Sequence, residues 1–283
     1  MELQKHHQDF VNFLKSKSRA SATVTAYSKD IEQLIAYLTT EGKSNWSEVT
    51  TENLQGFLNA LSGKGYTAKS VSRKINSVKT FYRYLQNEKV IEANASSAIT
   101  HPKFESKAPR ILSRIEYRAL RDACRDDVRI SAIVELLLQT GMRIGELAAL
   151  TVDSVKADSI VIPEVENHEP REVPLNKAAK SALTAYLTSR PKVKNNALFI
   201  TKTGRPFLIR NIRTSIDRYF KLAGIKEAKV NDLRHTFIAY HLASGASPVL
   251  IAKLAGHKRI STTEKYLDYI KDLPIEKVKL EEL

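Results

Sequence analysis

The fold is decided by residues 230–269, which read VNDLRHTFIAYHLASGASPVLIAKLAGHKRISTTEKYLDY. Apolar residues recur in this stretch at the spacing of a buried helix face. Gly245 and Gly256 interrupt the pattern, as glycines do at the C-termini of helices. Ser247 followed by Pro248 is typical of a helix N-terminus. The stretch therefore predicts three consecutive helices joined by short turns.

Three side chains of types that often act in catalysis lie at or near the ends of these predicted helices. Arg234 belongs to the first helix and His257 to the turn after the second. Ser261 with Glu264 predicts a capping box, which places Tyr266 in the second turn of the third helix. Each has an ordinary reading as well: Arg234 as an ion-pair partner, His257 as a helix cap and Tyr266 as one of 11 tyrosines with a packing role. The spacing alone leaves both readings open.

The sequence before this stretch predicts further helices and a small β element. Residues 130–139 are strongly apolar, which indicates a buried helix. The segment GMRIGEL at 141–147 follows, where Arg143 can simply pair with Glu146. Residues 158–163 and 171–175 are predicted as two strands around a polar turn, and 197–201 as another short strand. We expect a mixed, mostly helical domain with a small β-sheet.

The first hundred residues predict a bundle of amphipathic helices, so the fold class as a whole is mainly α. The helix that begins near residue 67 has basic residues on its polar face, which can lie along DNA phosphates or simply face solvent. These candidate DNA-binding residues are Lys69, Arg73, Lys74, Lys79 and Arg83.

A break in the helical pattern divides the chain. Residues 94–110, NASSAITHPKFESKAPR, are rich in serine, alanine, proline and lysine. We therefore predict a helical domain over 1–94, a linker over 95–110 and a second domain over 111–283.

Composition indicates the kind of partner. The 283 residues carry a net charge of +14 with a pI near 9.7, and both halves are basic, which favours an anionic partner, nucleic acid above all. No apolar run is long enough for a membrane span, and the polar start lacks a secretory signal. The single cysteine, Cys124, excludes an internal disulfide. We expect a cytoplasmic protein without membrane contact.

Four ordered blocks resemble the tyrosine recombinase (phage integrase) family. They are TGMRIGEL at 140–147, NDLRHTF at 231–237, LAGH at 254–257 and STTEKY at 261–266. The N-terminal half is similar to the family's helical, SAM-like core-binding domain. The length, without an arm-binding domain, resembles the Xer proteins, the archaeal XerA type in particular.

The resemblance implies a mechanism for cutting and rejoining duplex DNA. Arg143 and Arg234 would hold the phosphate oxygens, with a hydrogen bond from His257. Tyr266 would attack the phosphodiester and form a 3′-phosphotyrosine link. The resemblance further implies a homotetramer on two DNA sites. No cofactor or metal site is expected.

Two departures from the family pattern concern proton transfer. The family's H-x-x-R histidine is Asn231 here, which cannot carry a proton near neutral pH. The family's hairpin lysine is also missing, since residues 157–176 contain no lysine. We hypothesise that His168 replaces it as general acid, with Glu166 and Glu169 favouring its protonated form. Water or a lysine elsewhere, such as Lys202 or Lys258, is the alternative donor.

Several functions remain open at this level. The Xer resemblance favours resolution of chromosome dimers at a dif-like site, with a DNA translocase as a conceivable partner. The alternatives are a type IB topoisomerase-like enzyme, a mobile-element integrase and an accessory protein with impaired catalysis.

Apolar residues in the tail, residues 268–283, would pack on the chain's own domain or, by family resemblance, on a neighbouring protomer.

Overall fold

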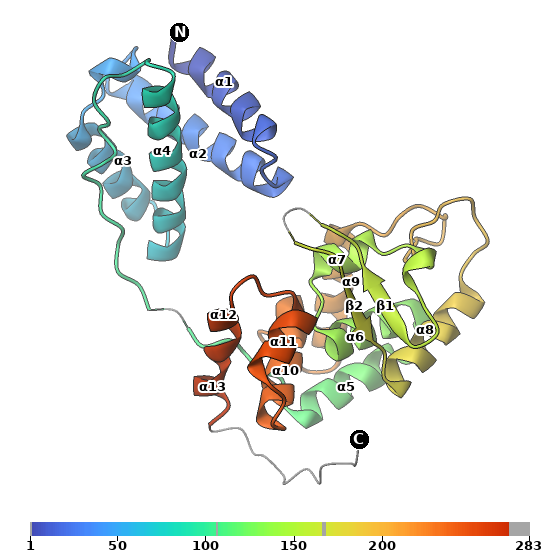
Figure 1. Cartoon of the computed structure of the whole chain (residues 1–283). Helices are drawn as coiled ribbons and strands as arrows, with labels where there is room; N and C mark the ends of the chain where they lie inside the picture. Colours follow the sequence, from blue (N-terminus) through green and yellow to red (C-terminus); the bar gives the residue numbers. More distant parts are fainter. Residues whose placement is uncertain (1, 106, 166–167, 272–283) are drawn as a thin grey trace. The chain divides into compact units, whose positions relative to one another are not determined.

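The computed structural model describes residues 2–105, 107–165 and 168–271 (Figure 1). The tail beyond residue 271 and the hairpin residues 166 and 167 lie outside the described residues. The chain divides into two compact units, Met1–Ser106 and Lys107–Leu283. Both are mostly helical and a two-stranded sheet lies in the second, which confirms the fold class expected from the sequence. Within the described residues, no helix combines the length and apolar character needed to cross a membrane.

The first unit is a helical bundle around an aromatic core. Phe81 packs against Phe10 and Trp46, with ring centroids 5.0 and 4.7 Å apart. Thr50 and Thr67 cap the third and fourth helices by accepting hydrogen bonds from backbone N–H groups of the first turn. The elements are α1 (Glu2–Ser16), α2 (Ser21–Thr40), a 3-10 turn (Trp46–Glu48), α3 (Thr51–Gly63) and α4 (Ala68–Asn87).

The chain continues to pack on this unit after α4. Ser96 and Ile99 are buried, and Thr51 donates a hydrogen bond to the Ala95 carbonyl oxygen at 2.9 Å. The first residues of the segment expected to be a linker are therefore folded against the first unit.

The candidate DNA-binding face of α4 needs one correction. Lys74 is buried, and its ammonium donates hydrogen bonds to Asp30 at 2.7 Å and Gln33 at 2.6 Å. Arg73 donates hydrogen bonds to both oxygens of the same buried carboxylate. Helical spacing placed Lys74 on the polar face, but a buried acid on α2 draws its side chain into the bundle. Lys69, Arg73, Lys79 and Arg83 stay wholly or partly exposed.

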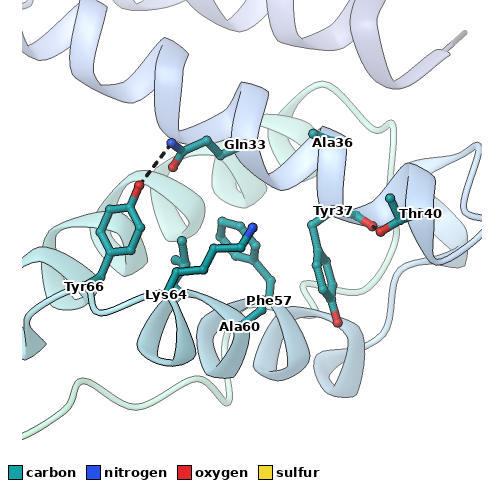
Figure 2. Close-up of a pocket in the computed structure, with 9 residues that line it drawn as sticks. Gln33, Ala36, Tyr37, Thr40, Phe57, Ala60, Lys64 and Tyr66 are labelled. Carbon is teal, nitrogen blue, oxygen red and sulfur yellow. Dashed lines mark hydrogen bonds between the residues drawn. The ribbon is translucent and has the colours of Figure 1, made fainter.

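A pocket of about 300 Å³ lies between α2 and α3 of this unit (Figure 2). Its wall is mainly apolar and aromatic, and Gln33 donates a hydrogen bond to the Tyr66 hydroxyl at 3.4 Å across one end. Lys64 is the one charged side chain among its lining residues, all of which are described.

The second unit is built around one buried helix, α6, as the apolar run at 130–139 predicts. The strands pair antiparallel, with Ser159 opposite Pro174 and Ile162 opposite Arg171. The expected strand at 197–201 forms only isolated bridges, from Ala197 to Thr151 and from Ile200 to Pro206. The elements up to the last helices are α5 (Arg114–Cys124), α6 (Val128–Thr140), α7 (Ile144–Ala149), a 3-10 turn (Val152–Ser154), β1 (Ser159–Ile162), β2 (Arg171–Pro174), α8 (Lys177–Ser189) and α9 (Ile209–Leu222).

The quoted stretch of sequence forms four helices that lie together in this unit (Figure 1). They are α10 (Val230–Ala243), α11 (Pro248–Ala255), α12 (Ile260–Glu264) and α13 (Tyr266–Tyr269). The predicted capping box at Ser261 is wrong. The helix starts two residues earlier, with Arg259 instead of Ser261 as its N-cap, and ends at Glu264, so Tyr266 opens a helix of its own.

We predict that Asp30→Asn destabilises the protein by about 3–5 kcal/mol, because it leaves the buried Lys74 ammonium without its counter-charge. Chemical denaturation monitored by circular dichroism measures the loss. The matched control is Glu41→Gln at the exposed end of α2. A loss below about 1 kcal/mol for Asp30→Asn, as for a surface ion pair, would contradict this account.

Candidate active site

Three arginines from different elements meet at the C-terminal end of α11. They come from the N-terminus of α7, the start of β2 and the first turns of α10. The unpaired carbonyl groups and the negative end of the helix dipole favour cations at such a position. The three hydrogen bonds are Arg171 Nε to Leu254 O at 2.7 Å, Arg234 Nη1 to Ala255 O at 2.6 Å and Arg143 Nη2 to Gly256 O at 2.9 Å.

Two glycines allow this close packing. Gly141 and Gly256 both have φ near +65°, at 62° and 69°, where they end α6 and α11. A Cβ on Gly256 would lie 2.7 Å from Arg171 Nη1, and one on Gly141 would lie 2.3 Å from the Phe237 ring. A side chain at Gly256 would therefore displace Arg171, and one at Gly141 would displace Phe237.

A single buried carboxylate, Glu146, holds two of the arginines. It accepts hydrogen bonds from Arg143 Nη1 at 2.9 Å and from both terminal nitrogens of Arg171, at 2.9 and 2.7 Å. The Arg143 backbone N–H also donates to it at 2.8 Å. Burial raises the pKa of Glu146, but the hydrogen bonds from Arg171 and Arg143 outweigh burial and bring the pKa to about 2. Arg143 therefore forms the ordinary pair with Glu146 and also belongs to the arginine cluster.

Arg234 is the most deeply buried of the three arginines. Its Nη1 donates to the carbonyl oxygens of Gly141 and Ala255, both at 2.6 Å. Its Nε and Nη2 have no hydrogen-bond partner within the part of the chain that the structure describes. Burial, followed by the nearby Arg143, lowers the pKa of Arg234 to about 9. Three guanidiniums with one carboxylate leave an excess of positive charge that favours a bound anion.

His257 lies beside this cluster, in the turn after α11. Its Nδ1 is 2.6 Å from the hydroxyl oxygen of the buried Thr263, and its ring is near-parallel to the Tyr266 ring with centroids 6.5 Å apart. Burial and the arginines, Arg234 first, lower the pKa of His257 to about 4. The imidazole is therefore neutral at pH 7.

Tyr266 is nearly buried at 7% exposure, and its hydroxyl oxygen is 2.5 Å from His235 Nδ1. Burial raises the pKa of Tyr266, and Arg234 acts in the opposite direction. The structure thus brings Arg143, Arg234, His257 and Tyr266 into one site, as the sequence predicts.

A cavity of about 720 Å³ adjoins the cluster on the hairpin side. Its lining residues are His168, Glu169, Pro170, Arg171, Glu172, Ala252, Lys253, Gly256, His257 and Lys258. It is lined by side chains of the hairpin, of α11 and of the following turn, which can surround a ligand bound at the arginines.

His168 does reach this cavity, but its charge state differs from the expectation. Burial and the nearby Arg143 lower its pKa, whereas Glu166 and Glu169 were expected to raise it. Glu166 lies outside the described residues. The Nδ1 atom of His168 is buried and has no hydrogen-bond partner in the described part of the chain. The histidine is therefore neutral in the DNA-free protein.

Asn231 and the basic residues of α4 are the remaining expected site residues. Asn231 is exposed in the first turn of α10, and no hydrogen bond of its side chain is found within the described ranges. The basic residues of α4 belong to the first unit. Within the described residues, no group of three or more His, Cys, Asp and Glu side chains is placed to hold a metal ion.

Three residues of the site were not assigned to it from the sequence: Arg171, His235 and Thr263. In the sequence Arg171 is only the first residue of a predicted strand, and His235 is only the neighbour of Arg234 in a motif block. No local pattern links any of them to a partner, because their partners are in other elements. Glu146 carried a weak signal, as a lone acid in the apolar segment GELAAL.

The chain is similar to known proteins over most of its length. Residues 110–271 match the model of the phage integrase family, and residues 8–89 match the phage integrase N-terminal SAM-like domain. The chain is 29% identical over 282 residues to tyrosine recombinase XerC of Listeria welshimeri, covering 95% of this chain and 94% of that protein.

Two solved structures are also similar. The crystal structure of XerA recombinase matches with a TM-score of 0.54 and 27% identity, over 93% of each chain. A lambda integrase (75–356) dimer bound to a COC′ core site matches with a TM-score of 0.76 and 17% identity, over 92% of this chain and 96% of that chain. At that identity, the second likeness concerns the fold alone.

We predict that Glu146→Gln lowers stability at pH 7 by about 3 kcal/mol, because two buried guanidiniums lose their counter-charge. The pKa of Glu146 is lower in the folded protein, at about 2, than the ordinary 4.5. Its stabilising effect is therefore complete above pH 4.5 and is lost as pH falls toward 2. The difference between wild type and variant should shrink over that range, measured by denaturation at each pH. A difference that stays constant down to pH 2, or a similar effect in the exposed control Glu264→Gln, would contradict the assignment.

Proposed function

Because this chain belongs to the phage integrase family of tyrosine recombinases, we propose that Tyr266 is the nucleophile with which it cuts and rejoins duplex DNA. The chain is a DNA breaking–rejoining enzyme that acts in site-specific recombination. The observation that carries the residue assignment is the cluster itself: three arginines and one carboxylate beside a buried tyrosine.

The arginines supply the electrostatic part of the reaction. Attack on a phosphodiester places negative charge on the non-bridging oxygens of a pentacovalent transition state. Arg143 and Arg234 have guanidinium N–H groups beyond those bound to the protein, and these can donate to the oxygens. Arg171, whose Nε and terminal nitrogens bind Leu254 and Glu146, keeps the other two in place.

His257 adds a neutral hydrogen-bond donor. If its Nδ1 accepts from the Thr263 hydroxyl, the ring proton is on Nε2, and the lowered pKa keeps the ring in that form. The Nε2–H group can then donate to a phosphate oxygen beside the arginines. Thr263 therefore fixes the tautomer that the reaction needs.

The rest of the chain would hold the substrate. We infer that the first unit binds duplex DNA through Lys69, Arg73, Lys79 and Arg83 of α4, while Lys74 stabilises the bundle instead. Strand exchange between two sites needs one nucleophile for each of four strands, hence a homotetramer. The XerC relative and the XerA neighbour favour a dif-like chromosomal site, and therefore the cytoplasm as the location.

We predict that Tyr266→Phe binds its DNA site with unchanged affinity but forms no covalent adduct, since only the attacking oxygen is removed. Nicked suicide DNA trapped in detergent and resolved by electrophoresis measures the adduct. Tyr269→Phe is the matched control: it removes the hydroxyl group from the ring packed edge-on against Tyr266 and should keep the adduct. A covalent complex with Tyr266→Phe would falsify the nucleophile assignment. A two-site recombination assay then separates strand exchange from topoisomerase-like relaxation.

The leaving 5′ oxygen needs a proton, and the cavity beside the cluster contains two candidate donors. His168 and Lys258 both line it together with His257. The negative charge of bound DNA would favour the protonated form of His168, against the effect of the surrounding cations. We propose that one of these two side chains replaces the missing hairpin lysine.

We predict that His168→Ala or Lys258→Ala slows cleavage of ordinary DNA by about 10²–10⁴-fold, as expected for loss of a general acid. The same variant should cleave a substrate with sulfur in place of the bridging 5′ oxygen at nearly the wild-type rate, because a thiolate leaves without a proton. Single-turnover adduct formation on both substrates is the measurement. Lys221→Ala, at an exposed position in the last turn of α9, is the control variant. Equal losses on both substrates for both variants would rule out a proton donor in this cavity.

A further inference from the structure

We propose that His235 is the general base that takes the phenol proton from Tyr266 during attack on DNA. The proposal rests on the nucleophile assignment above and adds the group that activates that nucleophile. His235 touches the reacting oxygen, so it would be a catalytic residue and not only a support for one.

The contact is short and specific. His235 Nδ1 is 2.5 Å from the Tyr266 hydroxyl oxygen, although 31 positions separate the two residues in the chain. Their rings lie side by side, with centroids 5.8 Å apart and an interplanar angle of 36°. The two residues come from α10 and α13, which pack directly on each other. When the hydroxyl group donates to Nδ1, the histidine proton is on Nε2.

The surroundings keep His235 ready to accept a proton. Burial, with the neighbouring Arg234, lowers its pKa, while Asp232 on the same helix acts in the opposite direction. From α13 it faces Tyr266, and from the turn after α11 it faces His257, whose own pKa it helps to lower. The imidazole is therefore neutral at pH 7, as a base must be.

Tyr266 needs such a base. Burial raises its pKa, so the phenol is protonated at neutral pH and is a weak nucleophile. Asn231, at the position of the family's H-x-x-R histidine, cannot accept a proton and is exposed without a contact to Tyr266 in the described structure. No other basic side chain is recorded within hydrogen-bond distance of the Tyr266 oxygen among the described residues.

The proton balance of the step is simple. The Tyr266 oxygen forms a bond to phosphorus as its proton passes to His235 Nδ1, giving an imidazolium. The bond from phosphorus to the 5′ oxygen breaks, and that oxygen leaves with the electron pair and gains a proton from the general acid. In religation the 5′ hydroxyl attacks phosphorus as its proton returns to the deprotonated general acid, the bond from phosphorus to the Tyr266 oxygen breaks, and His235 returns its proton to that oxygen.

His235→Asn and His235→Ala separate a base from a positioning group. The Asn side chain places a hydrogen-bond acceptor near the position of Nδ1 but cannot take up a proton, whereas Ala removes both. The measurement is single-turnover adduct formation on the substrate with bridging 5′ sulfur, which needs no general acid, from about pH 5 to pH 9. DNA affinity is measured in parallel to show that both variants fold and bind.

We expect the wild-type rate to fall as the pH drops below the pKa of His235, which lies under 6.5. Both variants should be about 10²–10⁴-fold slower at pH 7, should lack this acid limb, and should gain rate at high pH as Tyr266 ionises unaided. His241→Asn is the matched control, because His241 lies on the same helix but packs on Phe237 instead of Tyr266. It should keep the wild-type rate and pH profile.

Two outcomes would overturn the proposal. A near-normal rate for His235→Asn with a slow His235→Ala would show that the hydrogen bond only positions Tyr266. An acid limb that persists in His235→Asn would assign the titration to another group. Neither result would affect the nucleophile assignment, which fails only if Tyr266→Phe itself forms the adduct.

Discussion

The second unit depends on the way in which like charges are held together at the end of one short helix. Three guanidiniums would repel each other in an apolar interior, yet each donates to a different carbonyl oxygen at the C-terminus of α11. Glu146 supplies the only carboxylate that contacts them within the described residues. The helix end and this one carboxylate together offset the repulsion only in part, so the site keeps an affinity for an anion.

That incomplete compensation explains the charge states in the site. The lowered pKa values of Arg234 and His257 have the same physical origin, namely burial in a region of excess positive charge. A bound phosphodiester would neutralise part of this excess positive charge. The functional consequence is that His257 and His235 are both neutral, one suited to donating and the other to accepting, although they lie beside the same arginines.

Helices and a strand around the site fix the positions of the arginines. The buried helix α6 ends at Gly141, whose carbonyl oxygen binds Arg234, and the next two residues lead to Arg143 at the start of α7. The hairpin brings Arg171 onto α11 because β2 begins at that residue and contacts the helix. The side chains are therefore held by rigid elements and not by long loops.

The sequence by itself determined the local structure and the family. Apolar periodicity and helix-start signals such as Ser247 followed by Pro248 defined most helices, because such capping hydrogen bonds close within four residues. The four motif blocks predict Arg143, Arg234, His257 and Tyr266 as site residues without any knowledge of the geometry. The local signal at Ser261 was wrong, since the helix begins at Ile260 with Arg259 as its N-cap.

Only the tertiary structure decided which partners these side chains have. The contacts of Tyr266, Arg171, Arg234 and Arg143 span 31, 83, 93 and 113 positions, and no periodic pattern encodes pairs at such separations. Lys74 shows the same limit, since helical spacing placed it in solvent while Asp30, on another helix, buries it. Charge states follow from burial and from distant neighbours, so the neutral His235 beside Tyr266 emerges only once the chain is folded.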